Sequence, residues 1–228
     1  MDPVIRVLVV DDDPLVRAGL GLMFNAADDI EIVGEAEDGD DVPPLVERLR
    51  PDLVLMDIRM PRVDGLAATK ALRRRPDGPQ VLILTTFTTD GYILGALRAG
   101  AAGYLLKHTP PAQIVAAVRN TMAGEPVLSP DAVKQLISAV TDLTDGTDGT
   151  DPGPDDARAV AQARLRLLGE REREVALAVA RGRTNAEVAG DCHMSLPTVK
   201  AHVSHILTKL DLNNRVQIAL LVYRAGLA

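Results

Sequence analysis

Acidic residues follow two apolar runs of the sequence, at positions where their carboxylates could act together. The three aspartates Asp11–Asp13 come directly after the run Val4–Val10, and Asp57 comes directly after Leu53–Met56. Both runs are typical of buried parallel strands, which end at the sheet edge where such folds place their ligands. Like charges this close raise one another's pKa unless a cation compensates, and carboxylate oxygens suit Mg²⁺. The spacing therefore predicts a magnesium site.

A hydroxyl group and an ammonium group are predicted at the same sheet edge. Thr85 stands at the end of the apolar run Val81–Leu84, and Lys107 stands at the end of Gly103–Leu106. A hydroxyl, an ammonium and a metal ion can together surround the oxygens of a transferred phosphoryl group. The sequence contains no Walker-type nucleotide loop, so a separate donor would supply the phosphate. Asp57 is the candidate nucleophile that would accept it.

The elements that position these residues alternate between short apolar runs and longer helical patterns. This alternation predicts an α/β fold with a parallel sheet that is covered by helices on both faces. In a flavodoxin-like, doubly wound order 2-1-3-4-5, the first and third strands are neighbours, which brings Asp11 and Asp12 against Asp57. Strands are expected at Val4–Val10, Ile30–Ala36, Leu53–Met56, Val81–Leu84 and Gly103–Leu106, and helices at Pro14–Ala26, Val42–Leu49, Gly65–Arg75, Asp90–Ala99 and Pro111–Ala123.

Helical periodicity fails between about residues 138 and 156, where Thr, Asp and Gly dominate. Such an acidic, low-complexity stretch cannot bury enough apolar surface to order itself. A calcium loop is disfavoured, because aspartates at every third position differ from the alternate-residue ligands of an EF-hand and no Glu closes the loop. We expect a phosphoacceptor α/β domain at residues 1–126, an acidic flexible linker at 127–164 and an all-α domain at 165–228.

The composition is that of a globular protein of two domains, 228 residues long, with only 2% aromatic residues and therefore aliphatic cores. Cys192 is the single cysteine, so no intramolecular disulfide can form, which fits a reducing compartment. No segment approaches the roughly 18 apolar residues of a membrane span, and the amino terminus has no signal-peptide pattern. A cytoplasmic protein without a membrane partner is expected.

The carboxyl-terminal part is basic although the chain as a whole carries a net charge of −7. Residues 166–228 contain nine Lys and Arg against six Asp and Glu, whereas residues 1–128 contain 13 against 19. A local basic patch can attract nucleic acid despite the total charge. Only about four residues separate the second and third of its expected helices, as in a helix-turn-helix. The helices are expected at Gly169–Ala180, Asn185–Gly190, Leu196–Leu210 and Arg215–Arg224.

The expected helix Leu196–Leu210 has two distinct faces on a helical wheel. Its apolar stripe comprises Val199, Val203, Ile206 and Leu210. The opposite face carries small and hydrogen-bonding side chains, which suit the major groove of DNA. The wheel alone fits an ordinary solvent-facing helix equally well.

Four segments resemble, in the same order, the motifs of receiver domains in two-component response regulators. They are Val7–Pro14, Leu53–Pro61, Leu84–Phe87 and Gly103–Lys107. The resemblance implies that Asp57 is the phosphoacceptor and that Asp12, assisted by Asp11, is a direct metal ligand. It also implies that the backbone carbonyl of Arg59 is a third protein ligand to the metal. Asp13 lies outside this pair.

The same resemblance assigns a switch. Thr85 is expected to bind the phosphoryl group and move inward, Tyr104 to change rotamer with it, and Lys107 to hold the phosphoryl oxygens. His108 follows Lys107 where the family has proline, so a cis Lys-Pro bond is impossible.

The carboxyl-terminal motifs 168–175, 180–189 and 198–203 resemble the LuxR-type helix-turn-helix. With the receiver motifs, this makes the chain similar to the NarL/FixJ subfamily nearly throughout, outside the linker. The resemblance implies a recognition helix at Leu196–Leu210 and a helix at Arg215–Arg224 that supports dimerisation. Residues expected to face DNA are Thr198, Lys200, Ala201, Ser204, His205 and Thr208, with Lys200 as a principal contact.

The sequence therefore favours a phosphorylation-dependent transcription regulator, not an enzyme, that accepts a phosphoryl group from a sensor histidine kinase and binds double-stranded DNA as a homodimer. An aspartate-nucleophile phosphatase would need a second acid two residues after the nucleophile, and that residue is Arg59. A DNA-binding regulator that ignores phosphorylation is the remaining alternative.

Overall fold

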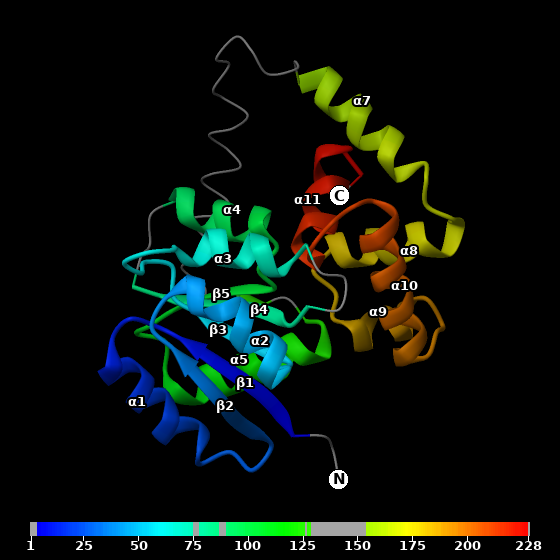
Figure 1. The fold of residues 1–228 in the computed structure, drawn as a ribbon. Coiled ribbons are helices and arrows are strands. Elements are labelled where there is room, and N and C mark those ends of the chain that lie inside the picture. Colours follow the sequence, from blue (N-terminus) through cyan, green and yellow to red (C-terminus); the bar gives the residue numbers. More distant parts are fainter. Residues whose placement is uncertain (1–3, 75–77, 87–89, 126, 129–153, 228) are drawn as a thin grey trace. The chain divides into compact units, whose positions relative to one another are not determined.

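The structure is a computed structural model that describes residues 4–74, 78–86, 90–125, 127–128 and 154–227 (Figure 1). The chain divides into two compact units, Met1–Leu136 and Ile137–Ala228. Each unit has its own buried core.

The first unit contains a parallel sheet in the order β2-β1-β3-β4-β5-β6. Its strands are β1 (Ile5–Val10), β2 (Ile30–Ala36), β3 (Leu53–Met56), β4 (Gln80–Thr85), β5 (Gly103–Leu106) and β6 (Val127–Leu128). The flavodoxin-like order 2-1-3-4-5 predicted from the sequence is confirmed. The short strand β6 pairs in parallel with β5 and adds a sixth member that the sequence analysis did not predict.

Helices cover both faces of this sheet, which explains why its strands are apolar on both sides (Figure 1). They are α1 (Pro14–Phe24), the short 3₁₀ helix η1 (Gly39–Asp41), α2 (Val42–Leu49), α3 (Gly65–Leu72), α4 (Asp90–Ala99) and α5 (Pro111–Ala123). α1 and α5 contribute Phe24 and Val118 to the core on one face, together with Val7 and Leu55 of the strands. Compared with the expected ranges, α1 ends two residues earlier, at Phe24.

Among its described residues the second unit contains helices and the turns that join them, with no strand (Figure 1). The helices pack around an aliphatic core. Its helices are α7 (Pro154–Leu165), α8 (Glu170–Ala180), α9 (Asn185–Asp191), α10 (Leu196–Lys209) and α11 (Arg215–Arg224). Val175 of α8, Val188 of α9, Val199 of α10 and Val222 of α11 are fully buried in this core. The predicted all-α domain is therefore confirmed.

Helix α7 begins inside the range expected to be linker, residues 127–164, and packs against the other helices of the second unit. Ala161 and Leu165 are buried in its core, and the amide of Gln162 donates a hydrogen bond to the carbonyl of Ala225 at 3.0 Å. The guanidinium of Arg164 donates to the carbonyl of Leu210. The expected linker thus includes structured residues at both ends, β6 and α7, while its low-complexity middle lies outside the described residues.

Candidate functional site

Three carboxylates converge at the carboxyl ends of β1 and β3. Val10 pairs with Met56 across these strands, so the residues that follow them lie side by side. One carboxylate oxygen from each of Asp11, Asp12 and Asp57 lies within 4.8 Å of the other two. Asp11 and Asp57 are buried, whereas Asp12 is exposed. The doubly wound topology therefore brings together the acids that the sequence singled out.

The side chain of Lys107 reaches into this pocket from the end of β5. Its Nζ lies 2.7 Å from Oδ2 of Asp57 and 2.7 Å from Oδ2 of Asp11. Burial alone would lower the pKa of the Lys107 ammonium, but its hydrogen bonds to the two carboxylates outweigh burial and raise it. Burial raises the pKa of Asp11, and Lys107 offsets this only in part. One positive charge cannot balance three carboxylates, so the donor set fits a divalent metal ion.

The backbone around Asp57 is tightly fixed. Its N–H donates to the carbonyl of Val10 at 2.9 Å, and its Oδ1 accepts the N–H of Ile58 at 2.6 Å. The N–H of Gly65, the first residue of α3, donates to the carbonyl of Ile58 at 2.7 Å. A Cβ at Gly65 would lie 1.9 Å from the Asp57 carbonyl oxygen. The loop can close this tightly on Asp57 only because residue 65 is glycine.

Thr85 and Tyr104 are buried polar residues of β4 and β5. Thr85 is the last residue of β4, and its carbonyl accepts the N–H of Lys107 at 2.8 Å. It therefore lies at the same sheet edge as the carboxylates. Burial, together with the negative charge of Asp57, raises the pKa of the Tyr104 phenol. The environment of Tyr104 therefore disfavours its ionised form more than water does.

Two other residues near the pocket are engaged outside it. Oδ1 of Asp13 accepts the N–H of Leu15 at 2.8 Å and so caps α1. The side chain of Arg59 turns towards α4, where its Nη2 donates to the Tyr92 hydroxyl at 3.1 Å and its guanidinium lies 5.8 Å from the ring centroid. All peptide bonds of the described residues are trans, including the one that follows Lys107.

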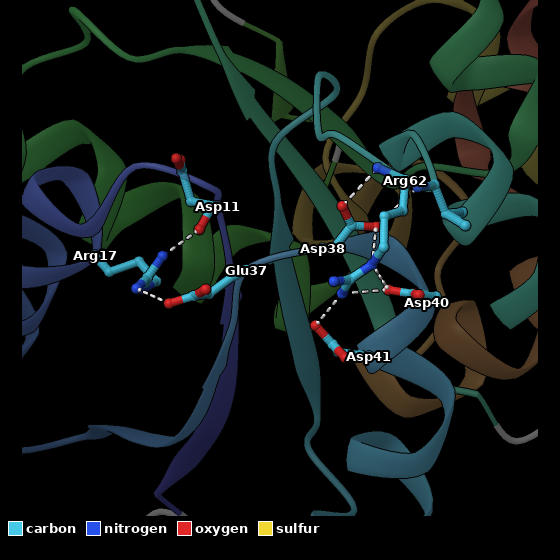
Figure 2. A network of polar contacts seen from close by, with 8 residues as sticks. Asp11, Arg17, Glu37, Asp38, Asp40, Asp41 and Arg62 are labelled. Carbon is cyan, nitrogen blue, oxygen red and sulfur yellow. Dashed lines mark hydrogen bonds and ion pairs between the residues drawn. The ribbon is translucent and has the colours of Figure 1, made fainter.

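Two polar networks that were not predicted from the sequence lie beside the pocket (Figure 2). Arg17 of α1 donates to the main-chain carbonyl of Asp11 at 2.7 Å. Asp38, just after β2, accepts the main-chain N–H of Arg62 at 2.8 Å. These contacts join loops that are distant in the sequence. The signal that could have found them is the acidic run at the end of β2, residues 35–41, which needs cationic or N–H partners.

The second unit contains a helix-turn-helix formed by α9 and α10. A capping box begins α9: Thr184 Oγ1 accepts the N–H of Glu187 at 3.2 Å, and Glu187 Oε2 accepts the N–H of Thr184 at 2.8 Å. Ser195 caps the start of α10, where its side chain accepts the N–H of Thr198 at 3.2 Å. Arg215 is buried and donates to the side chain of Asn185, which ties the start of α11 to the start of α9.

Helix α10 buries one face in the core of its unit. Val199 and Ile206 are fully buried and Leu210 nearly so, whereas Val203 is only half-buried at the core's edge. The predicted apolar stripe is therefore narrower than the wheel implied. The residues predicted to face DNA are all exposed: Thr198, Lys200, Ala201, Ser204, His205 and Thr208. Exposure alone leaves their contacts with DNA a prediction.

Comparison with known families matches both units. Residues 7–119 match the response regulator receiver domain, and residues 166–222 match the bacterial regulatory proteins of the luxR family. The transcriptional regulatory protein LiaR of Bacillus subtilis (strain 168) is 35% identical over 220 residues, which cover 96% of this chain and 97% of LiaR. The response regulator protein VraR of Staphylococcus aureus (strain COL) is 35% identical over 224 residues, 98% of either chain.

Solved structures agree with this match. The response regulator ChrA of a heme-sensing two-component system is 35% identical, with 99% of both chains covered and a TM-score of 0.52. A two-component response regulator of the LuxR family from Aurantimonas sp. SI85-9A1 is 31% identical, with 60% of this chain and 99% of that one covered and a TM-score of 0.57.

Among the described residues, no helix combines the length and apolar character that crossing a membrane requires. The similarity to LiaR and VraR spans both units in the same order, with the acidic pocket in the first and the helix-turn-helix in the second. The chain therefore belongs to the two-component response regulators of the NarL/FixJ type, transcription regulators rather than enzymes, in which a receiver domain precedes a LuxR-family DNA-binding domain.

Proposed function

We propose that this response regulator accepts a phosphoryl group on Asp57 from a sensor histidine kinase and then binds double-stranded DNA as a homodimer to regulate transcription. The observation that carries the proposal is the contact between Asp57 and Lys107 inside a cluster of three carboxylates. A protein with these partners acts in the cytoplasm of a bacterium.

The proposed transfer needs a nucleophile and a positive charge at fixed positions. A carboxylate oxygen of Asp57 forms a bond to phosphorus while the bond between phosphorus and the donor imidazole nitrogen breaks, and the electron pair stays on that nitrogen. The ammonium of Lys107, 2.7 Å from Asp57, is placed to hold the phosphoryl oxygens.

Mg²⁺ is the proposed cofactor. Asp12 would bind it directly, together with Asp11, Asp57 and the backbone carbonyl of Arg59. The support is the donor set itself, three carboxylates whose oxygens converge within 4.8 Å and whose charge Lys107 leaves unbalanced. When bound, the ion supplies positive charge that neutralises the carboxylates and the phosphoryl oxygens.

The proposed switch runs from the pocket along the sheet edge. The Thr85 hydroxyl would bind a phosphoryl oxygen and Tyr104 would change rotamer in response, which shifts a pre-existing equilibrium towards the active dimer. The burial of both residues on neighbouring strands supports this coupling, since β4 and β5 pair directly.

DNA is the proposed partner of the exposed face of α10. Lys200 would contact a base edge or a phosphate, flanked by Thr198, Ala201, Ser204, His205 and Thr208. Helix α11 would support dimerisation. The proposal is supported by the orientation of α10: Val199 and Ile206 on its opposite face are fully buried in the core, which leaves the predicted DNA-binding face exposed.

Selection from random-sequence DNA pools, with and without a small phosphodonor and Mg²⁺, tests the proposal. The wild-type protein should gain acid-labile phosphate and enrich one sequence more strongly when phosphorylated, whereas Asp57→Asn should gain no phosphate. Equal enrichment by wild-type and Asp57→Asn protein would overturn phosphorylation dependence in favour of a regulator that works by its DNA-binding domain alone.

A further inference from the structure

The side chain of Arg17 joins α1 to the end of β2 and contacts the backbone of Asp11 on the way. Its Nη1 donates to the Asp11 carbonyl at 2.7 Å, its Nε to Glu35 at 3.1 Å and its Nη2 to Glu37 at 2.8 Å. Figure 2 shows the guanidinium between Asp11 and Glu37. The Arg17 side chain is only 10% exposed, against 49% for Glu35 and 74% for Glu37.

This arrangement is more than a surface ion pair. Exposed pairs contribute little to stability, and removing a guanidinium from water is costly, so pairing with two exposed glutamates does not account for its burial. Burial instead delivers a charged donor to one main-chain carbonyl. The glutamates hold the other two edges of the planar guanidinium, so the group has little freedom to turn away from Asp11.

The Asp11 carbonyl belongs to the peptide plane that Asp11 shares with Asp12. Because a peptide bond is planar, a hydrogen bond that fixes this oxygen also fixes the direction in which the chain enters Asp12. The N–H of Asp11 donates to the Ala36 carbonyl at 3.1 Å, and Oδ1 of Asp11 accepts the N–H of Asp13 at 3.0 Å. Arg17 completes this restraint on the loop that carries both acids.

We propose that Arg17 is a positioning residue that orients Asp11 and Asp12 towards the divalent metal ion. The inference rests on the proposed function, in which Asp12 is a metal ligand. Groups that orient the ligands of a metal site influence its affinity although they never touch the ion.

The sign of one measurement separates positioning from simple electrostatics. Mg²⁺ affinity of the full chain is measured by isothermal titration calorimetry for wild-type and Arg17→Gln protein. If Arg17 acted only through its charge, its removal would strengthen Mg²⁺ binding, because a positive charge beside the pocket opposes the cation. If Arg17 positions the ligands, Arg17→Gln should weaken Mg²⁺ binding by about 10-fold.

Arg119→Gln is the matched control. Arg119 of α5 makes a two-armed pair with Asp29, at 2.7 and 2.6 Å, before the start of β2 and so at the opposite edge of the sheet from the pocket. The Arg119→Gln substitution removes an arginine and an ion pair from the same domain, and the Mg²⁺ affinity of this variant should equal that of the wild type.

Arg17→Lys tests whether the shape of the group matters. Lysine keeps the charge but cannot reach the carbonyl and both glutamates at once, so Mg²⁺ affinity should fall between those of wild-type and Arg17→Gln protein. This variant decides the matter if Arg17→Gln does not fold, as judged by circular dichroism and urea unfolding. Wild-type affinity in Arg17→Lys would then overturn the proposal.

Failure of this inference is distinguishable from failure of the proposed function. No Mg²⁺ binding by the wild type, or unchanged binding by Asp12→Ala, overturns the metal site and the inference with it. Normal wild-type binding with equal or tighter binding by folded Arg17→Gln overturns the positioning role alone. A purely structural role would lower the urea midpoint of Arg17→Gln and leave the affinity of the folded protein unchanged.

Discussion

Lys107 holds Asp57 through a contact of 2.7 Å between Nζ and Oδ2, and it makes an equal contact with Asp11. The ammonium therefore already neutralises part of the negative charge that would attract a metal ion. The same group is placed to meet a phosphoryl group on Asp57. Its removal should thus affect metal binding and phosphoryl transfer in opposite directions.

Lys107→Met should keep Mg²⁺ affinity at or above the wild-type value, because a competing cation is lost. Phosphorylation of Asp57 by a small phosphodonor should slow by about 100-fold, as when a donor to a developing oxyanion is removed. Calorimetry and phosphate incorporation report the two effects separately. Parallel loss of both would show that Lys107 shapes the pocket rather than acting through its charge.

Asp12→Ala and Asp13→Ala should separate metal binding from helix capping in adjacent residues. Asp12 joins the carboxylate cluster, whereas Asp13 accepts the N–H of Leu15 at the start of α1. Asp12→Ala should weaken Mg²⁺ binding and leave stability nearly unchanged. Asp13→Ala should lower the free energy of unfolding by about 1 kcal/mol and keep Mg²⁺ affinity. If titration and urea unfolding gave the reverse pattern, the metal ligand would be Asp13 and not Asp12.

Gly65→Ala should disturb Asp57 directly, since a Cβ would lie 1.9 Å from the Asp57 carbonyl oxygen. The backbone must shift, at a cost of about 1–3 kcal/mol in stability. A displaced nucleophile should slow phosphate incorporation by about 100-fold.

Gly19→Ala is the matched glycine variant, because a Cβ there meets nothing within 4 Å. It lies inside α1 and should raise stability by about 0.5–1 kcal/mol without changing phosphorylation. Equal phosphorylation rates in the two glycine variants would contradict a tight loop around Asp57.

Asp38 should make the stability of the first unit depend on pH. Burial alone would raise the pKa of Asp38, but N–H donors from Val63 and Arg62 hold it below its ordinary value. The stabilisation is therefore complete above the unfolded pKa of about 3.9 and is lost as the pH falls through the folded pKa. In Asp38→Asn one carboxylate oxygen is replaced by an NH₂ group, which cannot accept the main-chain N–H that faces it. The lost hydrogen bond should lower the free energy of unfolding by about 1–3 kcal/mol near neutral pH.

Urea unfolding across pH provides the measurement. The advantage of the wild type over Asp38→Asn should shrink as the pH falls below about 4. Asp40→Asn, at a half-exposed residue that pairs with Arg62, is the control and should change stability little at any pH. A constant difference between wild-type and Asp38→Asn protein down to low pH would exclude titration of Asp38.

Two adjacent residues of α10 are expected to have different roles, one in DNA binding and one in the core. Lys200 is exposed and Val199 is fully buried. Lys200→Ala should keep the circular dichroism of the wild type. If Lys200 reads a guanine edge, its loss should weaken DNA binding by about 1–3 kcal/mol. If Lys200 contacts a phosphate, its loss should reduce the salt dependence of DNA binding by about one in the slope of log K against log salt concentration. Val199→Asp should unfold the second unit because it buries an unpaired charge. Normal DNA binding by Lys200→Ala, with substitutions of Ser204 and His205 equally silent, would exclude α10 as the DNA-reading helix.

The strand order and the pocket were accessible from the sequence for a physical reason. Strands covered on both faces are continuous apolar runs, and residues after such runs meet at one sheet edge. Asp57 and Lys107, 50 positions apart, could thus be placed together before any coordinates existed. The carbonyl ligand expected from Arg59 and the motions expected of Thr85 and Tyr104 remain predictions.

Other features leave no such pattern. The hydrogen bond from Arg17 to Asp11 joins a side chain to a main-chain oxygen of another element, and no periodicity records it. Strand β6 has only two residues, too few for an alternation to appear. Val203 was placed in the core because a wheel assumes that a whole stripe is covered, whereas burial depends on the neighbouring helices.

The packing of α7 determines where the second unit can be joined to a different receiver domain. A chimera joined at residue 165 would leave behind Gln162 and Arg164, which bind the carbonyls of Ala225 and Leu210 where α11 and α10 end. A junction before Pro154 would transfer these contacts together with α10 and α11. The unit that can be transferred intact, in nature or in the laboratory, thus begins with α7, two helices before the helix-turn-helix of α9 and α10.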